Sequence, residues 1–254
     1  MIRRALEDVT LAMTFMTRLP LPCGWIRRER KLAEALWAMP LGGMLAGVLG
    51  GIFMFAANRA GLPVDLSGIL AVAAMTLATG ALHEDGLADF CDGLGGGRSA
   101  EQRLAIMRDS QIGSYGAITL IFAFASLIAL IEELFILLSF AHFLAVIVAA
   151  AAVSRCSSPL IFALLRPARN DGLAKFFGHP GHFNIALTLI WPSLMAIVML
   201  SVPQAFALLS GALVATLAIA ALAHRYLGGY TGDVLGAGIS LSFITSLIAI
   251  RLTS

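Results

Sequence analysis

Residues 66–97 read LSGILAVAAMTLATGALHEDGLADFCDGLGGG, an uncharged apolar run that ends in a cluster of acids. The four carboxylates of this cluster fall within nine residues: Glu84, Asp85, Asp89 and Asp92. If the segment is helical, Asp85, Asp89 and Asp92 occupy positions i, i+4 and i+7 and share one face. Like charges on one face destabilise an isolated helix, and Mg²⁺ prefers carboxylate oxygens completed by water and substrate phosphates. The stretch therefore predicts a membrane protein with a metal–phosphate site at its surface.

The composition excludes several classes of protein. The chain has 254 residues, of which 59% are hydrophobic and 13% charged, with a mean hydropathy of +0.90. Soluble domains average about 45–50% apolar and about 25% charged residues, so this chain belongs with polytopic membrane proteins. The net charge is only +2 and no basic tract occurs, which argues against a nucleic-acid partner. Three cysteines without close spacing argue against a disulfide framework or a cysteine-built zinc site.

Uncharged apolar runs approach the length of a bilayer span, which is about 20 residues. They number seven: 36–57, 66–82, 115–131, 134–153, 183–201, 205–223 and 234–250. The predicted fold class is an all-α, polytopic transmembrane helix bundle of six to eight spans, with seven as the best count. Residues 1–254 are expected to form a single integral-membrane domain.

The basic residues predict the orientation of the chain. Of the 17 Lys and Arg residues, all but Arg59 and Arg251 fall in segments that share one side of the membrane when the N-terminus is inside. Those segments are 1–35, 83–114, 154–182 and 224–233. The positive-inside rule therefore places the N-terminus and the motif-bearing loops in the cytoplasm. We expect a multi-pass protein of the cell inner membrane.

The acidic cluster and its neighbours are the predicted catalytic centre. A solvated helix start would explain Glu84 and Asp85, but neither Asp89 and Asp92 nor the glycines that follow. We expect Glu84, Asp85, Asp89 and Asp92 to hold Mg²⁺, with Glu84 as a ligand or a base. Gly95 and Gly96 would let the backbone approach a phosphate. His83 would serve as a partner of the acids or as a base.

The rest of the 83–114 segment adds further candidates. Asp109 and Ser110 precede Gly113 and Gly116 in what resembles a site loop, and Asp109 would be a fifth catalytic carboxylate. Arg103 is equally well explained as a contact to phosphate or as a positive-inside tether.

Two other inner segments carry charge that suits an anionic substrate. Arg155 and Arg169 are predicted to contact phosphate groups, and Asp171 is a further predicted substrate contact, although topology signalling alone would also account for these cations. The last inner segment contains Thr231, Gly232 and Asp233 at the mouth of a span. An acid that enters a membrane helix by default indicates function, so these three residues are expected to contact substrate.

The motifs together resemble the cobalamin synthase family, whose members are adenosylcobinamide-GDP ribazoletransferases. The resemblance is carried, in order along the chain, by residues 83–93, 108–116, 154–155, 168–172 and 229–237. It implies an integral-membrane enzyme of the last steps of cobalamin biosynthesis. Such an enzyme joins adenosylcobinamide-GDP to α-ribazole, or to its 5′-phosphate, releases GMP and needs Mg²⁺. Its partners would be these small molecules and the lipid bilayer, and other corrin-pathway enzymes or a second copy of the chain remain open.

Phosphoryl transfer agrees with the acids and cations, because positioned metal ions and cations supply most of its catalysis. The alternative is a membrane transporter with an acidic ion site, since intramembrane acids also mark ion pathways. A transporter predicts acids at mid-membrane and internal repeats, whereas these acids cluster at one face. A structural partner of other corrin enzymes is a third reading, which gives no reason for the acid–glycine cluster.

Overall fold

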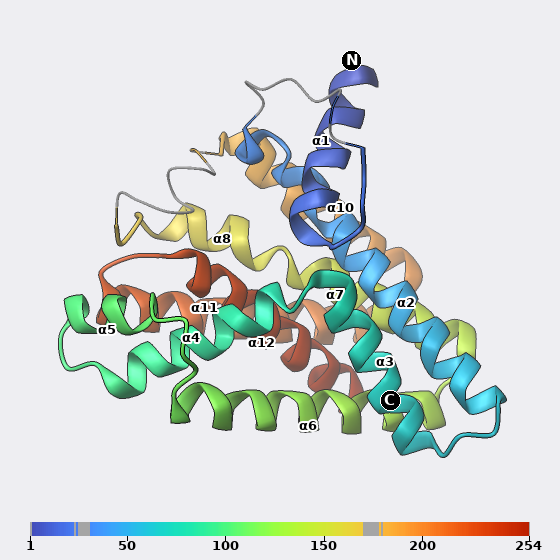
Figure 1. Ribbon diagram of the computed structural model, residues 1–254. Helices are drawn as coiled ribbons and strands as arrows, with labels where there is room; N and C mark the ends of the chain where they lie inside the picture. The colour runs from blue at the N-terminus through green and yellow to red at the C-terminus, as the bar shows by residue number, and fades with distance from the viewer. Residues whose placement is uncertain (1, 23, 25–30, 170–177, 179, 254) are drawn as a thin grey trace.

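The computed structural model describes residues 2–22, 24, 31–169, 178 and 180–253. Within these ranges the chain is helical, apart from turns, loops and an isolated bridge between Pro167 and Tyr230. Six segments are long and apolar enough to cross a membrane, and a bent pair of helices raises the number to seven. The predicted all-α, multi-pass bundle is therefore confirmed (Figure 1).

The N-terminal half of the bundle ends in a sharp bend. Its helices are α1 (Ile2–Met16), the 3₁₀ turns η1 (Leu32–Glu34) and η2 (Leu36–Ala38), α2 (Met39–Arg59), α3 (Val64–Thr79) and α4 (Leu82–Gly96). Gly80 and Ala81 both adopt left-handed backbone conformations, with φ of 65° and 56°. A left-handed residue ends a helix, so α3 stops at Thr79 rather than continuing through the predicted span 66–82. The chain then turns by 89° into α4.

The C-terminal half contains the longest apolar helices. They follow in the order α5 (Ala100–Ile106), α6 (Ser114–Leu137), α7 (Phe140–Ser154), α8 (Ser157–Leu164), α10 (His182–Met199), α11 (Val202–Leu227) and α12 (Gly232–Arg251). The predicted break at Glu132 and Glu133 is wrong, because both residues lie inside α6. Glu133 forms an ion pair of 2.6 Å with Arg251 at the end of α12, so its charge does not require a loop.

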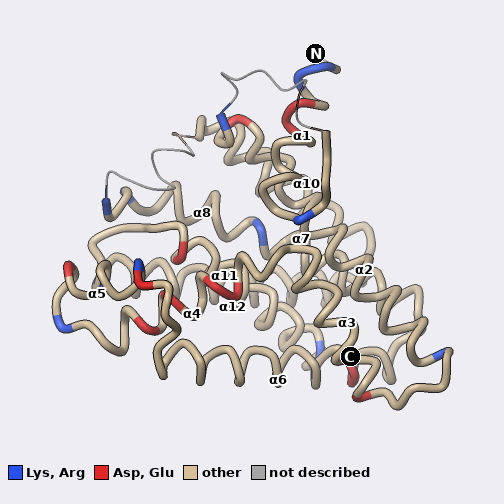
Figure 2. Tube along the Cα trace, viewed as in Figure 1, with Lys and Arg blue, Asp and Glu red and all other residues tan. Residues whose placement is uncertain are grey.

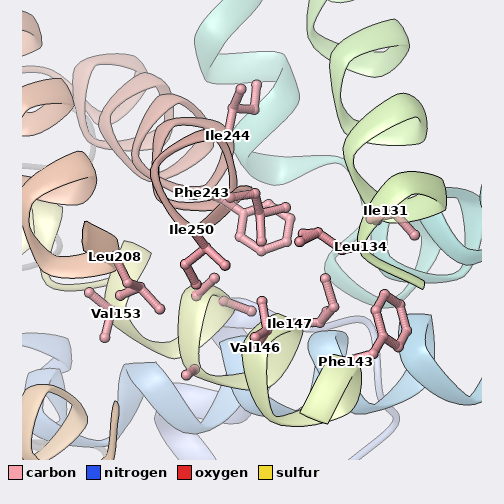
Figure 3. Close-up of a cluster of buried hydrophobic side chains, with 14 of the residues drawn as sticks. Ile131, Leu134, Phe143, Val146, Ile147, Val153, Leu208, Phe243, Ile244 and Ile250 are labelled. Atoms are coloured by element: carbon pink, nitrogen blue, oxygen red, sulfur yellow. The ribbon is translucent and has the colours of Figure 1, made fainter. Parts of the chain in front are cut away.

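The core lies between α6, α7, α11 and α12. In Figure 3 aromatic and branched side chains from these helices, including Leu134, Phe143, Leu208 and Phe243, point toward one another. The span Phe140–Leu164 is 83% buried within the protein, against 17% for Ser114–Leu137. A helix that is apolar on all sides and buried belongs inside a bundle, so α7 is the central helix and α6 lies at the edge.

Glycines of α2 allow it to lie directly against α7. A Cβ atom added to Gly47 would lie 3.0 Å from the Cα atom of Val148, and one added to Gly43 would overlap the carbonyl oxygen of Ala151. Close approach of two backbones through small residues is a usual way to associate helices in a membrane. The contact fixes α7 and therefore the helices packed on it.

Gly47→Leu should destabilise the protein, because the added side chain must displace the backbone of α7. Overpacking of this kind lowers the free energy of unfolding by about 1–3 kcal/mol. Thermal unfolding of the purified protein in detergent, followed by tryptophan fluorescence, measures the effect. Gly181→Ala is the control, since no atom lies within 4 Å of an added Cβ there. Equal melting temperatures for the two variants would contradict the close α2–α7 contact.

Candidate active site

The backbones of α4 and α12 touch at a pair of glycines. A Cβ atom on Gly86 would lie 3.0 Å from the carbonyl oxygen of Asp233 and 3.2 Å from the Cα atom of Gly236. Only glycine leaves room for two backbones at this separation. The contact places the acids of α4 beside Asp233, the acid in the first turn of α12, and Figure 2 marks acidic positions in red.

A cavity of about 230 Å³ lies beside this glycine contact. Polar side chains enter it from His83 and Asp85 on α4 and from Asp233 on α12, and Gly232 also lines it. The opposite wall is apolar and comes from α1 and α2, through Phe15, Met16 and Met39. This wall was not predicted, because nothing in the sequence pattern of α1 distinguishes residues that line a site from residues that cover a core.

Asp89 lies on the same helix as Asp85, one turn further along. Burial, followed by the charges of Asp85, Asp233 and Asp92, raises the pKa of Asp89 to about 6. Asp89 follows the 89° bend, falls in the predicted inner segment 83–114 and is partly exposed. Burial is the larger cause of the raised pKa, and the neighbouring carboxylates add a repulsion that a bound cation would relieve.

Asp92 has a different environment from the other acids. Its Oδ2 accepts a hydrogen bond from the backbone N–H of Gly113 (2.7 Å), and its Oδ1 accepts one from Gly116 (2.8 Å). Gly113 is the N-cap residue of α6, so the carboxylate satisfies free N–H groups at the positive end of that helix. A Cβ atom on either glycine would overlap the Asp92 carboxylate. Asp92 thus caps α6, and its assignment as a metal ligand stays a prediction.

Arg169 and Asp233 are brought together by two loops. Arg169 Nη2 lies 3.6 Å from Asp233 Oδ2, and the Thr231 hydroxyl donates a 3.1 Å hydrogen bond to the same oxygen. The backbones of the loops are joined, because the N–H of Ala168 donates to the carbonyl oxygen of Tyr230. Predicted substrate contacts from distant parts of the sequence therefore lie side by side.

Glu84 and Arg155 point away from this cavity. Both line a second, much smaller cavity of about 30 Å³, which His83 also lines. Arg155 is only 5% exposed, and its Nη1 donates to the carbonyl oxygen of Ala151 (2.8 Å) and to Ser154 Oγ (3.1 Å). Burial and the charge of Arg155 hold the pKa of His83 well below its usual value, so the imidazole is neutral.

The remaining predicted residues are dispersed. Gly96 and Asp109 line a third hollow of about 350 Å³ together with Asp92. Gly95 packs against the ring of Tyr115. The Arg103 guanidinium lies over the ring of Tyr226, 4.9 Å from its centre, in a cation–π contact.

Two other predicted residues lie apart from these cavities or outside the description. Ser110 is exposed in the loop that follows α5. Asp171 lies outside the described residues.

The first cavity has the chemistry of a Mg²⁺ site that substrate completes. Among the described residues, no group of three or more His, Cys, Asp or Glu side chains could hold a metal ion by itself. Mg²⁺ however usually takes one or two carboxylates and fills its other positions with water and substrate phosphates. Asp85 fits that requirement because it lines the cavity, and Asp89, one turn further along α4, lies close enough for the charges of Asp85 and Asp233 to act on it.

The fold and the cavity define a multi-pass membrane protein whose acidic site lies at the ends of its helices. The chain belongs to the family whose model is described as cobalamin-5-phosphate synthase, which matches residues 8–251. It is therefore an enzyme, a transferase of cobalamin synthesis, and the family resemblance of its motifs is confirmed.

Individual relatives extend over nearly the whole chain. The chain is 40% identical over 248 residues to the adenosylcobinamide-GDP ribazoletransferase of Mesorhizobium japonicum, which covers 97% of this chain and 93% of the relative. Its counterpart in Bradyrhizobium diazoefficiens is 38% identical over 93% and 90% of the two chains. That of Escherichia coli is 36% identical over 94% and 96%. No solved structure matches the chain.

Asp92→Ala should lower the melting temperature in the absence of Mg²⁺, because a part-buried and a buried backbone N–H group lose their acceptor. An unsatisfied buried donor destabilises a protein by about 1–3 kcal/mol. Asp92→Asn keeps one acceptor oxygen and should fall between the wild type and Asp92→Ala. Thermal unfolding in EDTA measures the order, and Asp109→Asn is an exposed acidic control. A melting temperature that changes only when Mg²⁺ is present would contradict the capping role.

Asp89→Asn should make the protein more stable at pH 8 relative to the wild type. The folded-state pKa of about 6 exceeds the usual value of a carboxyl group, so ionised Asp89 destabilises the fold as the pH rises through that range. The wild type should therefore lose stability relative to the variant between pH 5 and pH 8. Melting temperatures of both proteins in EDTA at these two pH values test the sign, since bound Mg²⁺ would favour the ionised carboxylate. If the variant instead loses stability relative to the wild type between pH 5 and pH 8, ionised Asp89 stabilises the fold and the prediction is wrong.

Proposed function

We propose that the chain transfers the adenosylcobinamide phosphate group of adenosylcobinamide-GDP to α-ribazole, or to α-ribazole 5′-phosphate, in a Mg²⁺-dependent reaction that releases GMP. The substrates are those in the printed name of relatives that align over nearly the whole chain. The observation that carries the proposal is the position of Asp85 and Asp233, with Arg169 beside them, around a cavity with an apolar wall.

The reaction forms one phosphorus–oxygen bond and breaks another. A hydroxyl oxygen of the ribazole attacks the cobinamide-side phosphorus, the bond from that phosphorus to GMP breaks, and the hydroxyl proton is lost. Asp85 and Asp89 would hold Mg²⁺, which neutralises charge on the diphosphate when bound. Asp233 holds the Arg169 guanidinium at the cavity edge, where it can meet a phosphate oxygen.

The apolar wall has its own part in this proposal. Phe15, Met16 and Met39 face the acids across the cavity and would exclude water from the reacting diphosphate. Exclusion of water strengthens the electrostatic interactions inside a site and suppresses hydrolysis, which competes with transfer to the ribazole. Methionine and phenylalanine also suit contact with a large, mostly apolar substrate.

The proposed location is the cell inner membrane, with the cavity open to the cytoplasm. The support is the distribution of charge, since all but Arg59 and Arg251 of the 17 Lys and Arg residues belong to the predicted inner segments. The cavity residues on α4 and at the start of α12 lie in those segments. Substrate would therefore enter from the cytoplasmic side.

Purified protein incubated with adenosylcobinamide-GDP, α-ribazole and Mg²⁺ should release GMP, and chelation by EDTA should stop the release. Asp85→Asn and Asp89→Asn should each lower kcat by about 10²-fold or more, because electrostatic contacts in the transition state are worth that much. Asp65→Asn is the control, as this exposed acid lies at the other end of α3. Wild-type rates in both site variants would contradict the assignment. Ion flux in liposomes without any GMP release would favour the transporter.

A further inference from the structure

Four buried polar atoms surround the smaller cavity and have no hydrogen-bond partner among the described residues. They are His83 Nε2, Glu84 Oε2, Arg155 Nε and Ser240 Oγ, which we call the buried polar cluster. His83 and Arg155 are 4% and 5% exposed, so neither side chain reaches bulk solvent. Buried polar groups are nearly always hydrogen-bonded, so four unpartnered atoms around one cavity indicate a hydrogen-bonding partner inside it.

The cavity is small and its other walls are largely apolar. Its volume is about 30 Å³, and Val72, Leu127, Ile131 and Phe243 are among the residues that close it. A buried water needs about 10–15 Å³ and two to four polar partners. The cavity therefore has room for one or two water molecules, and the cluster supplies the partners that they need.

Glu84 and Arg155 interact across this cavity without touching. The charge of Arg155 acts on Glu84, yet among the described residues no ion pair within 4 Å joins the two side chains. The Arg155 Nη1 atom is turned back toward Ala151 and Ser154. Its Cδ atom packs on α2, where a Cβ on Gly43 would lie 2.9 Å away. Arg155 is thus fixed between α2 and α7.

We propose that the buried polar cluster binds internal water that joins Glu84 to Arg155, and that this link fixes the start of α4 against α7 and α12. Glu84 and Arg155 are then positioning residues, rather than a metal ligand and a phosphate contact. Asp85 follows Glu84 directly and lines the larger cavity, so the orientation of α4 that Glu84 fixes also orients Asp85. His83 and Ile239 line both cavities, which are therefore neighbours.

A double-mutant cycle tests the link without any activity measurement. Glu84→Gln and Arg155→Met should each lower the melting temperature by about 5 °C or more, because each leaves one buried charge without its partner. The double variant should be more stable than either single variant, since neither charge remains. Losses that simply add in the double variant would overturn the proposal. If a single variant does not insert into the membrane, recovery of monodisperse protein in the double variant is the same test.

Magnesium titration separates positioning from metal binding, and this arm rests on the proposed function. Glu84→Gln should lower kcat by about 10-fold or more but leave the half-saturating Mg²⁺ concentration within about twofold of wild type. Asp85→Asn should raise that concentration. A Glu84→Gln enzyme that needs at least 10-fold more Mg²⁺ would overturn the positioning role. If Asp85→Asn leaves the Mg²⁺ requirement unchanged, the proposed Mg²⁺ site of the function is contradicted. The double-mutant cycle still tests, independently, whether Glu84 and Arg155 are linked.

The assignment of Arg155 has its own readout. A positioning role predicts that Arg155→Lys lowers kcat and leaves the KM for adenosylcobinamide-GDP within about twofold. A phosphate contact predicts a raised KM instead, which would overturn this part of the proposal. An experimental map that resolves water should show a peak in contact with the cluster. A map in which the Glu84 carboxylate turns into the larger cavity would contradict it.

Discussion

The contact between Gly86 and Gly236 is the constraint on which the site depends. Helices that carry ordinary side chains lie about 8–10 Å apart, a separation that would keep the acids of α4 away from Asp233. At a glycine pair the backbones touch, and carboxylates from residues far apart in the sequence influence one another. The repulsion among them is tolerated because α4 and α12 share an apolar cluster, which includes Leu87 and Phe90 of α4 and Val234 of α12. Apolar packing between the two helices thus sustains an unfavourable arrangement of charge beside it.

Composition and charge sufficed to predict the class of fold, because a bilayer imposes length and polarity on every span. Local exceptions escaped prediction for identifiable reasons. Glu132 and Glu133 look like a loop, yet one is paired with Arg251 from the other end of the chain. The end of α3 depends on the left-handed backbone of Gly80 and Ala81, and a left-handed alanine has no signature in the sequence.

The candidate site shows a similar division. Sequence spacing predicted that Asp85, Asp89 and Asp92 share a face, but spacing along one helix does not show what lies opposite each residue. Asp92 accepts a hydrogen bond at the start of α6, whereas Asp85 lines the cavity of about 230 Å³. Glu84 lines the smaller cavity together with Arg155. Those differences arise from tertiary contacts made by glycines at positions 86, 113 and 116. The glycines were visible in the sequence, but their partners were not.

The cavity of about 230 Å³ beside the Gly86–Gly236 contact is lined by residues of α1 and by the first residues of α12, which are far apart in the sequence. During synthesis the N-terminal wall therefore exists long before Asp233 has left the ribosome. A nascent chain that lacks α12 has only the part of the cavity that α1, α2 and α4 form. Gly86 of α4 then has no helix packed against it. The cavity is complete only once α12 has docked, because residues of its first turns, including Asp233, line it.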